Sequence, residues 1–401
     1  MLKKRTFQEL VTDNCYIIFM LLTFGSFAYG IPGFLRALLW ILIVLLNLKY
    51  CKVRNAMDRL ILAYIVGAFL SLSGIIIRPY PLEFFLKVFV DSYVPIVFYF
   101  VGKNTSREVQ TTFYNRTLLA IIFVYVVGFY FLATMPSWYV EKSLEVINRS
   151  ASYNEDTLLY ARFGSFLDSY HVANMGVYAL CYTFGLLKSE NKNKIKILAY
   201  VGLGIIILAI LLSRQRVAMF VGIVVLLFYL LNVIKNKQSF IIISLAIFFL
   251  VYFIPQLMDD TTSSLVFGRF TKGESSNMVS QRMHQWIEAL TGIMEPIFGN
   301  GIGSGGHIAI SHGLHPSVAD GSYFKIWLEG GIYSTFLFLY ILYKSLLKAY
   351  INRKYYYVEF PILLFFACSL LGANIIDMPY IIAPMWYAIG RVNKNKICYK
   401  L

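Results

Sequence analysis

Long apolar runs constrain the fold of this chain more than any other feature of its sequence. A run of about 17 to 25 apolar residues is long enough to cross roughly 30 Å of hydrocarbon as an α-helix. Hydrophobic residues make up 58% of the 401 residues and charged residues only 14%, and the mean hydropathy is +0.65. These values exclude a soluble globular protein, so the sequence predicts an all-α, polytopic integral membrane protein.

Twelve apolar runs of roughly this length are present, which predicts a single membrane domain over residues 1–401 with about 12 transmembrane helices. No cleavable signal peptide is expected, because Lys3, Lys4 and Arg5 precede a long first span without a small-residue cleavage site at its end. The predicted spans are residues 14–30, 34–50, 59–77, 83–101, 117–135, 165–187, 195–213, 217–234, 239–257, 322–347, 358–376 and 379–392.

The 36 lysine and arginine residues lie mostly in alternate connections between these spans. Cytoplasmic loops of membrane proteins carry an excess of Lys and Arg, so both termini are predicted to be cytoplasmic. Two insertions, a smaller one at 136–164 and a large loop at 258–321 between the ninth and tenth spans, then face outward. The net charge of +15 is interpreted as attraction to the anionic cytoplasmic leaflet, and no nucleic-acid partner is expected.

Within the large loop, residues 279–294 have the periodicity of an amphipathic helix. At about 100° per residue, one apolar stripe contains Val279, Met283, Trp286, Ile287, Leu290, Ile293 and Met294. We expect a helix lying along the outer membrane surface. Arg282 falls at the border of this stripe. Its guanidinium either contacts a lipid phosphate or lipid-linked diphosphate, or snorkels to the surface without a ligand.

The segment FGNGIGSGGH at 298–307 contains Gly301, Gly303 and Gly306 at the spacing of a dinucleotide-binding fingerprint. No strand-helix-strand pattern surrounds it, so this interpretation is rejected. Two readings remain open: tight turns that present N–H groups to an anion, or a flexible loop without a ligand role.

Three histidines follow, His307, His312 and His315, with Asp320 nearby. Their spacing in an irregular glycine-rich segment does not match a zinc site, so no metal and no cofactor are expected. An imidazole at the mouth of a membrane cavity suits proton transfer or contact with a leaving diphosphate.

Arg214 and Arg216 lie in the short outward turn between the seventh and eighth spans. Cations close to the edge of the hydrocarbon cost free energy that an anionic partner would offset. A phosphate clamp is one explanation, and snorkelling or pairing with acidic side chains is the other.

Several of these motifs occur in a characteristic order. GNGIGSGG is followed by His315 and by VADGSYFKIWLEGG at 318–331, which leads into a long span. The turn at 213–216 and the Arg282-x3-Trp286 helix precede them. Together with the twelve-span topology, this order resembles the O-antigen polymerase and ligase superfamily of bacterial inner-membrane glycosyltransferases.

The resemblance implies a polymerase that joins undecaprenyl-diphosphate-linked oligosaccharides at the periplasmic face, without nucleotide sugar or metal. It implies the bacterial inner membrane as the location and membrane lipid as a partner. A chain-length regulator and a flippase are further candidate partners. The family's arginines match Arg214, Arg216 and Arg282 as diphosphate-binding residues, and its catalytic histidine matches His315. Asp320 matches a polar residue before the following span, and Gly301, Gly303 and His307 are candidate loop contacts.

One departure bears on the choice within the superfamily. Ligases commonly have His-Asn followed by an apolar pair, whereas His315 here is followed by Pro316 and, five positions on, by Asp320. This favours a polymerase over a ligase, and leaves open whether His315 or Asp320 accepts the proton.

Two other classes are alternatives. A polysaccharide flippase or other transporter is expected to place polar groups near the membrane midplane on broken helices, whereas the polar residues here concentrate in one loop. A non-catalytic membrane scaffold would give the outward arginines and GNGIGSGG no purpose.

Overall fold

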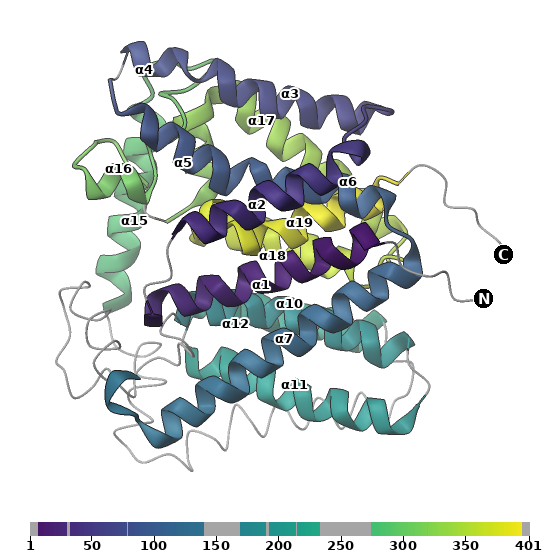
Figure 1. The fold of residues 1–401 in the computed structure, drawn as a ribbon. Coiled ribbons are helices and arrows are strands. Elements are labelled where there is room, and N and C mark those ends of the chain that lie inside the picture. The colour runs from purple at the N-terminus through teal and green to yellow at the C-terminus, as the bar shows by residue number, and fades with distance from the viewer. Residues whose placement is uncertain are drawn as a thin grey trace. The chain divides into compact units, whose positions relative to one another are not determined.

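The computed structural model describes residues 7–29, 33–77, 79–139, 169–189, 192–213, 215–232, 274–318 and 320–394. Every regular element within these ranges is a helix (Figure 1). The all-α prediction is therefore confirmed for this part of the chain. The predicted ninth span at 239–257, most of the smaller insertion and the first part of the large loop lie outside the described residues.

The chain divides into two compact units, which are considered separately. Unit 1 comprises residues 1–41 and 107–276, and α2 (Gly33–Asn47) and α15 (Glu274–Thr291) cross its boundaries with unit 2. In the described part of unit 1, the other helices are α1 (Phe7–Tyr29), α7 (Arg107–Thr134), α10 (Ser169–Ser189), α11 (Asn193–Ser213) and α12 (Arg216–Asn232).

Unit 2 comprises residues 42–106 and 277–401, and it carries the residues considered below. Besides η1 (Leu48–Tyr50), its helices are α3 (Ala56–Leu70), α4 (Ser73–Ile77), α5 (Leu82–Ser92), η2 (Val94–Ile96), α6 (Val97–Asn104), α16 (His307–Ser311), α17 (Ser322–Ile351), α18 (Glu359–Gly372), η3 (Ile375–Asp377) and α19 (Pro379–Val392).

Among the described residues, five helical stretches are long and apolar enough to cross a membrane: Ala56–Ile77, Leu82–Asn104, Thr112–Thr134, Asn193–Ser213 and Ser322–Ile351. Shorter apolar helices cover Ala37–Tyr50, Val217–Tyr229 and Glu359–Gly372. All eight overlap predicted spans, which supports a membrane protein. The count of twelve spans and the sidedness of the loops remain predictions.

Unit 1 is organised around α10, whose residues 172–185 are all buried. A helix that is apolar on every side is stable only when other helices surround it, and α10 packs against α7, α11 and α12. Two tyrosines form hydrogen bonds with the backbone of α10. The Tyr125 hydroxyl donates to the carbonyl of Val172 (2.6 Å), and the Tyr229 hydroxyl donates to the carbonyl of Cys181 (3.3 Å).

Unit 2 is organised around α19, which is buried along its whole length. Its neighbour α6 approaches closely because small residues face each other's backbone, with Gly102 of α6 against Tyr387 and Gly390 of α19 against Tyr99. On α6, Lys103 is buried and pairs with Asp58 of α3 (Nζ–Oδ2 2.5 Å). Lys103 thus joins two helices of unit 2.

Several predicted spans of unit 2 are interrupted rather than continuous. The 59–77 span separates into α3 and α4, and the 83–101 span separates into α5, η2 and α6 beside Pro95. Only non-helical connections and η3 link α18 to α19. Hydropathy alone does not detect such breaks, because an interrupted span is as apolar as a continuous one.

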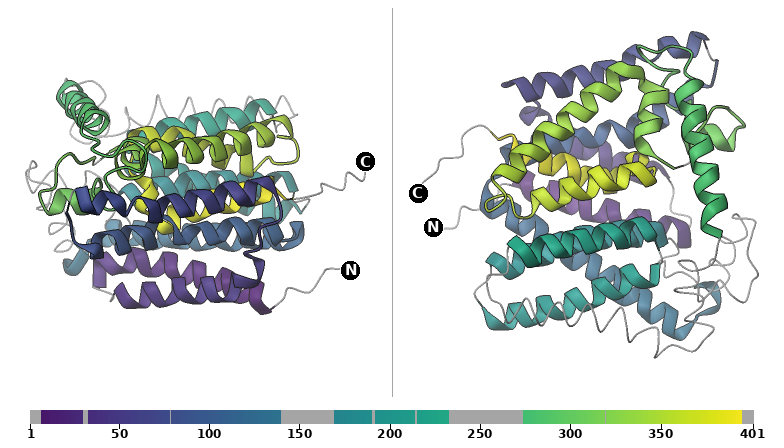
Figure 2. Two further views of the ribbon diagram at one scale, coloured as in Figure 1. Left: turned by 90° about the horizontal axis from the view of Figure 1, so that it is seen from above. Right: turned by 180° about the vertical axis from the view of Figure 1, so that it is seen from behind.

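The predicted 322–347 span is α17, and it changes direction at Gly331 (Figure 2). Gly331 has φ +63° and ψ −166°, which is a backbone conformation that residues with a Cβ rarely adopt. At the kink, two N–H groups of α17 bond to carbonyl groups outside the helix. Ile332 N donates to Pro296 O (2.9 Å), and Tyr333 N donates to Ile297 O (3.1 Å). Residues 296–297 are thereby fixed to the kink.

Candidate functional site

The helix predicted at 279–294 is present as α15, which lies across one end of the other unit 2 helices rather than parallel to them (Figures 1 and 2). Arg282 on this helix pairs with Asp320, which precedes α17 (Nε–Oδ2 2.9 Å). Two of the predicted site residues, 38 positions apart in the chain, are therefore in direct contact.

Trp286 lies one helical turn from Arg282 and helps to position the ion pair. Its indole N–H donates to the carbonyl of Asp320 (2.8 Å), and its ring stacks on Phe324 with centroids 4.8 Å apart. The same face packs Ala289 against Val318 and Leu328. Arg282 thus extends from a surface that packs against residues before and after Asp320, namely Val318 and the first turns of α17.

The prediction of one apolar stripe on α15 needs a correction. Trp286 turns inward with Ala289, whereas Met283, Ile287 and Leu290 are exposed. Two apolar faces therefore lie side by side on the helix. Periodicity merged them because they are adjacent, and only the packing against α17 separates them.

The pair remains accessible to a ligand. The Arg282 side chain is 41% exposed and that of Asp320 is 33% exposed. The Asp320 contact uses only Nε of a guanidinium that has five N–H donors in a planar fork. A cation held in one orientation, with donors still reachable from outside, is suited to binding a phosphate or diphosphate.

The glycine-rich segment is packed within unit 2, and the described residues account for much of its backbone hydrogen bonding. Ile302 N donates to Ser71 Oγ (3.3 Å), and Tyr80 donates to Ile302 O (2.7 Å). Val318 N donates to Gly305 O (2.7 Å). These bonds attach the segment to the turn after α3, to the connection between α4 and α5, and to the strip before Asp320. This packing argues against the flexible-loop reading.

The anion that the segment contacts in this structure belongs to the protein. Gly305 N donates to Glu329 Oε1 (3.1 Å), and Gly301 N donates to Glu329 O (3.1 Å). Gly301 has φ +96°, and a Cβ there would collide with the Tyr80 hydroxyl. Gly303 lies against the backbone of Phe84. Contact of Gly301 or Gly303 with a substrate remains a prediction.

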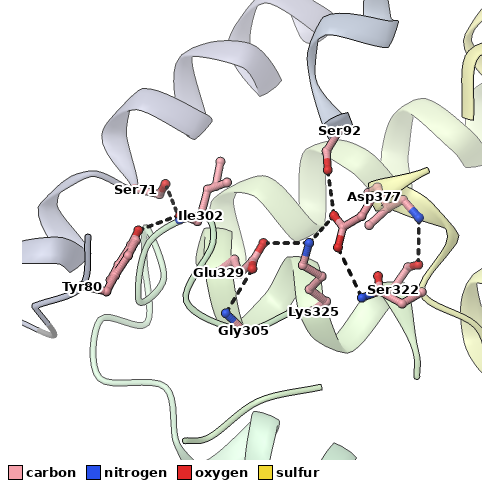
Figure 3. A network of polar contacts seen from close by, with 11 residues as sticks. Ser71, Tyr80, Ser92, Ile302, Gly305, Ser322, Lys325, Glu329 and Asp377 are labelled. Carbon is pink, nitrogen blue, oxygen red and sulfur yellow. Dashed lines mark hydrogen bonds and ion pairs between the residues drawn. The ribbon is translucent and has the colours of Figure 1, made fainter. Parts of the chain in front are cut away.

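Beside this segment lies a charged cluster that we define as Lys325, Glu329 and Asp377 (Figure 3). Lys325 Nζ contacts Asp377 Oδ1, and it lies 3.4 Å from Glu329 Oε2. The exposed fractions of the three side chains are 1%, 6% and 19%. The cluster contains one ammonium and two carboxylates, so its charges do not cancel if all three are ionised.

The cluster connects the interrupted helices. Asp377 Oδ1 also accepts the hydroxyl of Ser92, at the end of α5 (2.9 Å), and Asp377 follows α18 in the chain. Ser322 donates to the carbonyl of Ala373 (2.8 Å). Figure 3 shows Lys325 between Glu329 and Asp377, with Gly305 beside Glu329 and Ser92 beside Asp377.

Sequence reasoning missed this cluster, although signals for it were present. Lys325 and Glu329 are spaced i, i+4 inside a predicted span, and Asp377 falls between the last two spans. Ionisable residues in such positions indicate functional or structural pairing by default. Their grouping could not be read from the sequence, because Asp377 is 52 positions from Lys325.

The remaining predicted residues have varied positions. His307 is the first residue of α16 and is exposed, and His315 is exposed as well. The ring of His312 packs against Phe84 with centroids 4.5 Å apart. Arg216 is the first residue of α12, and α11 ends at Ser213. Arg214 and the Arg216 side chain lie outside the described residues.

Comparison with known proteins adds no relative: no family model matches the chain, and no curated protein matches it.

Proposed function

We propose that the protein is an O-antigen polymerase of the bacterial inner membrane. It joins undecaprenyl-diphosphate-linked repeat units at the periplasmic face. The observation that supports this most directly is the Arg282–Asp320 pair: an oriented, half-exposed guanidinium on a helix at one end of apolar unit 2 helices. An anionic headgroup that is attached to a membrane lipid would meet a cation at that place.

The proposed reaction is a direct displacement. The hydroxyl oxygen of the acceptor unit attacks the anomeric carbon of the donor glycan, and the bond from that carbon to the diphosphate oxygen breaks. The bonding electron pair leaves with undecaprenyl diphosphate, whose added charge Arg282, with Arg214 and Arg216, stabilises. The hydroxyl proton passes to His315, which is exposed, while Asp320 orients Arg282.

The decisive experiment gives purified protein single lipid-linked repeat units in detergent, without nucleotide or metal, and follows glycan length by gel. Wild type is expected to produce a ladder of longer chains. Arg282→Ala should reduce the rate about 10²- to 10³-fold, as for loss of one donor to a transition-state anion. Arg59→Ala is the matched control, because Arg59 is an exposed arginine elsewhere in unit 2.

Two outcomes would count against this proposal. If well-folded wild type did not elongate the lipid-linked repeat units, polymerase activity on them would be excluded. If Arg282→Ala produced normal chain lengths, the proposed binding of the diphosphate by Arg282 would be excluded. A ligase of the same superfamily is the nearest alternative. It would transfer the glycan once, to an acceptor other than the next repeat unit, and would leave no ladder.

A transporter or flippase is the second candidate, and one structural observation favours it. The charged cluster lies where helices are interrupted, as ion and substrate sites of transporters do. However, transporter sites lie near the membrane midplane, whereas Lys325 and Glu329 fall in the first two turns of α17. At 1.5 Å per residue they lie about 5 to 11 Å from the start of this helix. Deletion distinguishes the classes, because cells without a polymerase retain single lipid-linked units on the outer leaflet and cells without a flippase do not.

A further inference from the structure

A row of exposed apolar side chains follows α15 and continues beyond its end. We call this row the apolar stripe, and its residues are Met283, Ile287, Leu290, Met294 and Ile297. Their exposed fractions lie between 47% and 56%. Single exposed apolar residues are ordinary on protein surfaces, whereas a contiguous row indicates a surface that something apolar covers.

The stripe is one of three faces on α15. The face with Trp286 and Ala289 packs against the strip before α17 and its first turns. At about 100° per residue, His284 and Glu288 fall on a polar face, and the stripe lies between the polar and the packed faces. A helix with this pattern is suited to a position where protein, apolar medium and water meet.

The end of the stripe joins a helix of membrane-spanning length. Pro296 O accepts the N–H of Ile332 and Ile297 O accepts that of Tyr333, which brings the end of the stripe to the kink of α17. Beyond the kink, α17 exposes Ile332, Phe336, Leu339 and Tyr343, at 44% to 65%. Their spacing puts them on one helix face. From Ile332 to Ile351 the helix rises about 30 Å, which is the thickness of the hydrocarbon core.

The exposed face of α17 beyond the kink is therefore the part of a candidate span that meets lipid, and the stripe is its continuation. Because the stripe continues this lipid-facing surface, we expect lipid rather than water to cover the stripe. If the stripe faced water, one continuous apolar surface would pass from lipid to water at Ile297. At that point residues 296–297 are hydrogen-bonded to the kink of α17.

We propose that the apolar stripe is inserted into the bilayer, in the leaflet at the kinked end of α17. Bilayer acyl chains cover it, and the polar face with His284 and Glu288 remains in water. α15 is then a membrane-surface anchor that is coupled to a transmembrane helix through residues 296–297.

This insertion would fix the level of Arg282, a consequence that rests on the proposed function. Arg282 precedes Met283, the first residue of the stripe, and Asp320 and Trp286 restrain its orientation. A guanidinium next to an inserted residue lies at the level of the lipid phosphates. The diphosphate of a membrane-anchored carrier lies at that same level.

Depth-dependent fluorescence quenching tests the proposal without using activity. Ile287→Cys and Leu290→Cys report on the stripe, and His284→Cys and Glu288→Cys are matched controls one to three positions away on the same helix. All four are made in a background whose own five cysteines are replaced. Each is labelled with a polarity-sensitive fluorophore and reconstituted into phosphatidylcholine vesicles.

Labels at 287 and 290 should emit at shorter wavelength and be quenched by lipid nitroxides near the headgroup end of the acyl chain. Their quenching by aqueous iodide should be several-fold weaker than at 284 and 288. Equal iodide quenching at all four positions would overturn the proposal. Thermal melting that matches wild type establishes that each labelled protein is folded.

A second set of vesicles contains added undecaprenyl diphosphate and identifies a different occupant. If labels at 287 and 290 report water in phosphatidylcholine alone and become shielded only with this addition, the carrier's own chain covers the stripe. That result would also overturn insertion into the bilayer. Because the assay involves no glycan transfer, loss of polymerase activity would not affect its outcome.

Discussion

Unit 2 contains two ionic sites, and they differ in exposure and in the number of cations and carboxyl groups. The Arg282–Asp320 pair is half-exposed and matches one cation with one carboxyl group. In the charged cluster, Lys325 and Glu329 are buried, Asp377 is 19% exposed, and one ammonium faces two carboxyl groups. Burial determines what each can do. The pair can bind something from outside, and the charged cluster holds the interrupted helices together.

The energetics of the two sites should differ accordingly. A solvent-exposed ion pair contributes only about 0–1 kcal/mol to folding. Removing one partner of a buried pair costs about 3–5 kcal/mol, because the remaining charge is left without compensation. Substitutions at the two sites should therefore differ in their cost to stability.

Lys325→Met should have the largest effect on stability. It leaves the carboxylates of Glu329 and Asp377 buried without the ammonium between them, so we expect a loss of about 3–5 kcal/mol. Denaturant-induced unfolding in mixed micelles measures it. Glu329→Gln is the control. It removes the surplus negative charge and keeps an acceptor for Gly305 N, so its loss should be less than half as large. Equal losses would contradict the charge imbalance.

Gly301→Ala should come next, because it strains the segment whose backbone bonds to Glu329. The substitution forces a residue with a Cβ into φ +96° and against Tyr80. A loss of about 1–3 kcal/mol is expected, measured by the same unfolding assay. Gly313→Ala is the matched control, since Gly313 has φ +70° but nothing within 4 Å of an added Cβ. A Gly313 variant as unstable as Gly301→Ala would show that crowding contributes nothing.

Asp320→Asn should separate activity from stability at the half-exposed pair. Asparagine keeps a hydrogen-bond acceptor for Arg282 but removes the charge, so unfolding should change by less than about 1 kcal/mol. Elongation in the polymerase assay should fall about tenfold, which corresponds to about 1.4 kcal/mol, because the guanidinium is less restrained. A stability loss as large as that of Lys325→Met would remove the contrast between the two sites.

Trp286→Phe should have the smallest effect. Phenylalanine retains stacking on Phe324 and loses only the hydrogen bond to the carbonyl of Asp320. The expected loss of stability is about 1 kcal/mol, with a modest change in elongation. Trp286→Ala serves as the comparison, because it also removes the stacked ring. If the two variants unfolded identically, the ring would not contribute to the anchoring of α15.

Much of the helical architecture could be predicted from the sequence. The final predicted span at 379–392 has the same bounds as α19, and the helix expected in the large loop is α15. The contact of Arg282 with Asp320 was not predicted, although both residues were singled out. Apolar periodicity says where a helix forms, but it does not say which of two adjacent faces meets protein.

The amino-acid sequence by itself determined the helical elements and the apolar character of this chain, because both follow from side chains that are near neighbours. Only the tertiary structure decided that Lys325 meets Asp377, that Glu329 receives the N–H of Gly305, and that residues 296–297 occupy the kink at Gly331. These contacts join segments 24 to 52 positions apart. Their charges and hydrogen-bonding groups find partners only when α17 packs against the glycine-rich segment and the connection after α18.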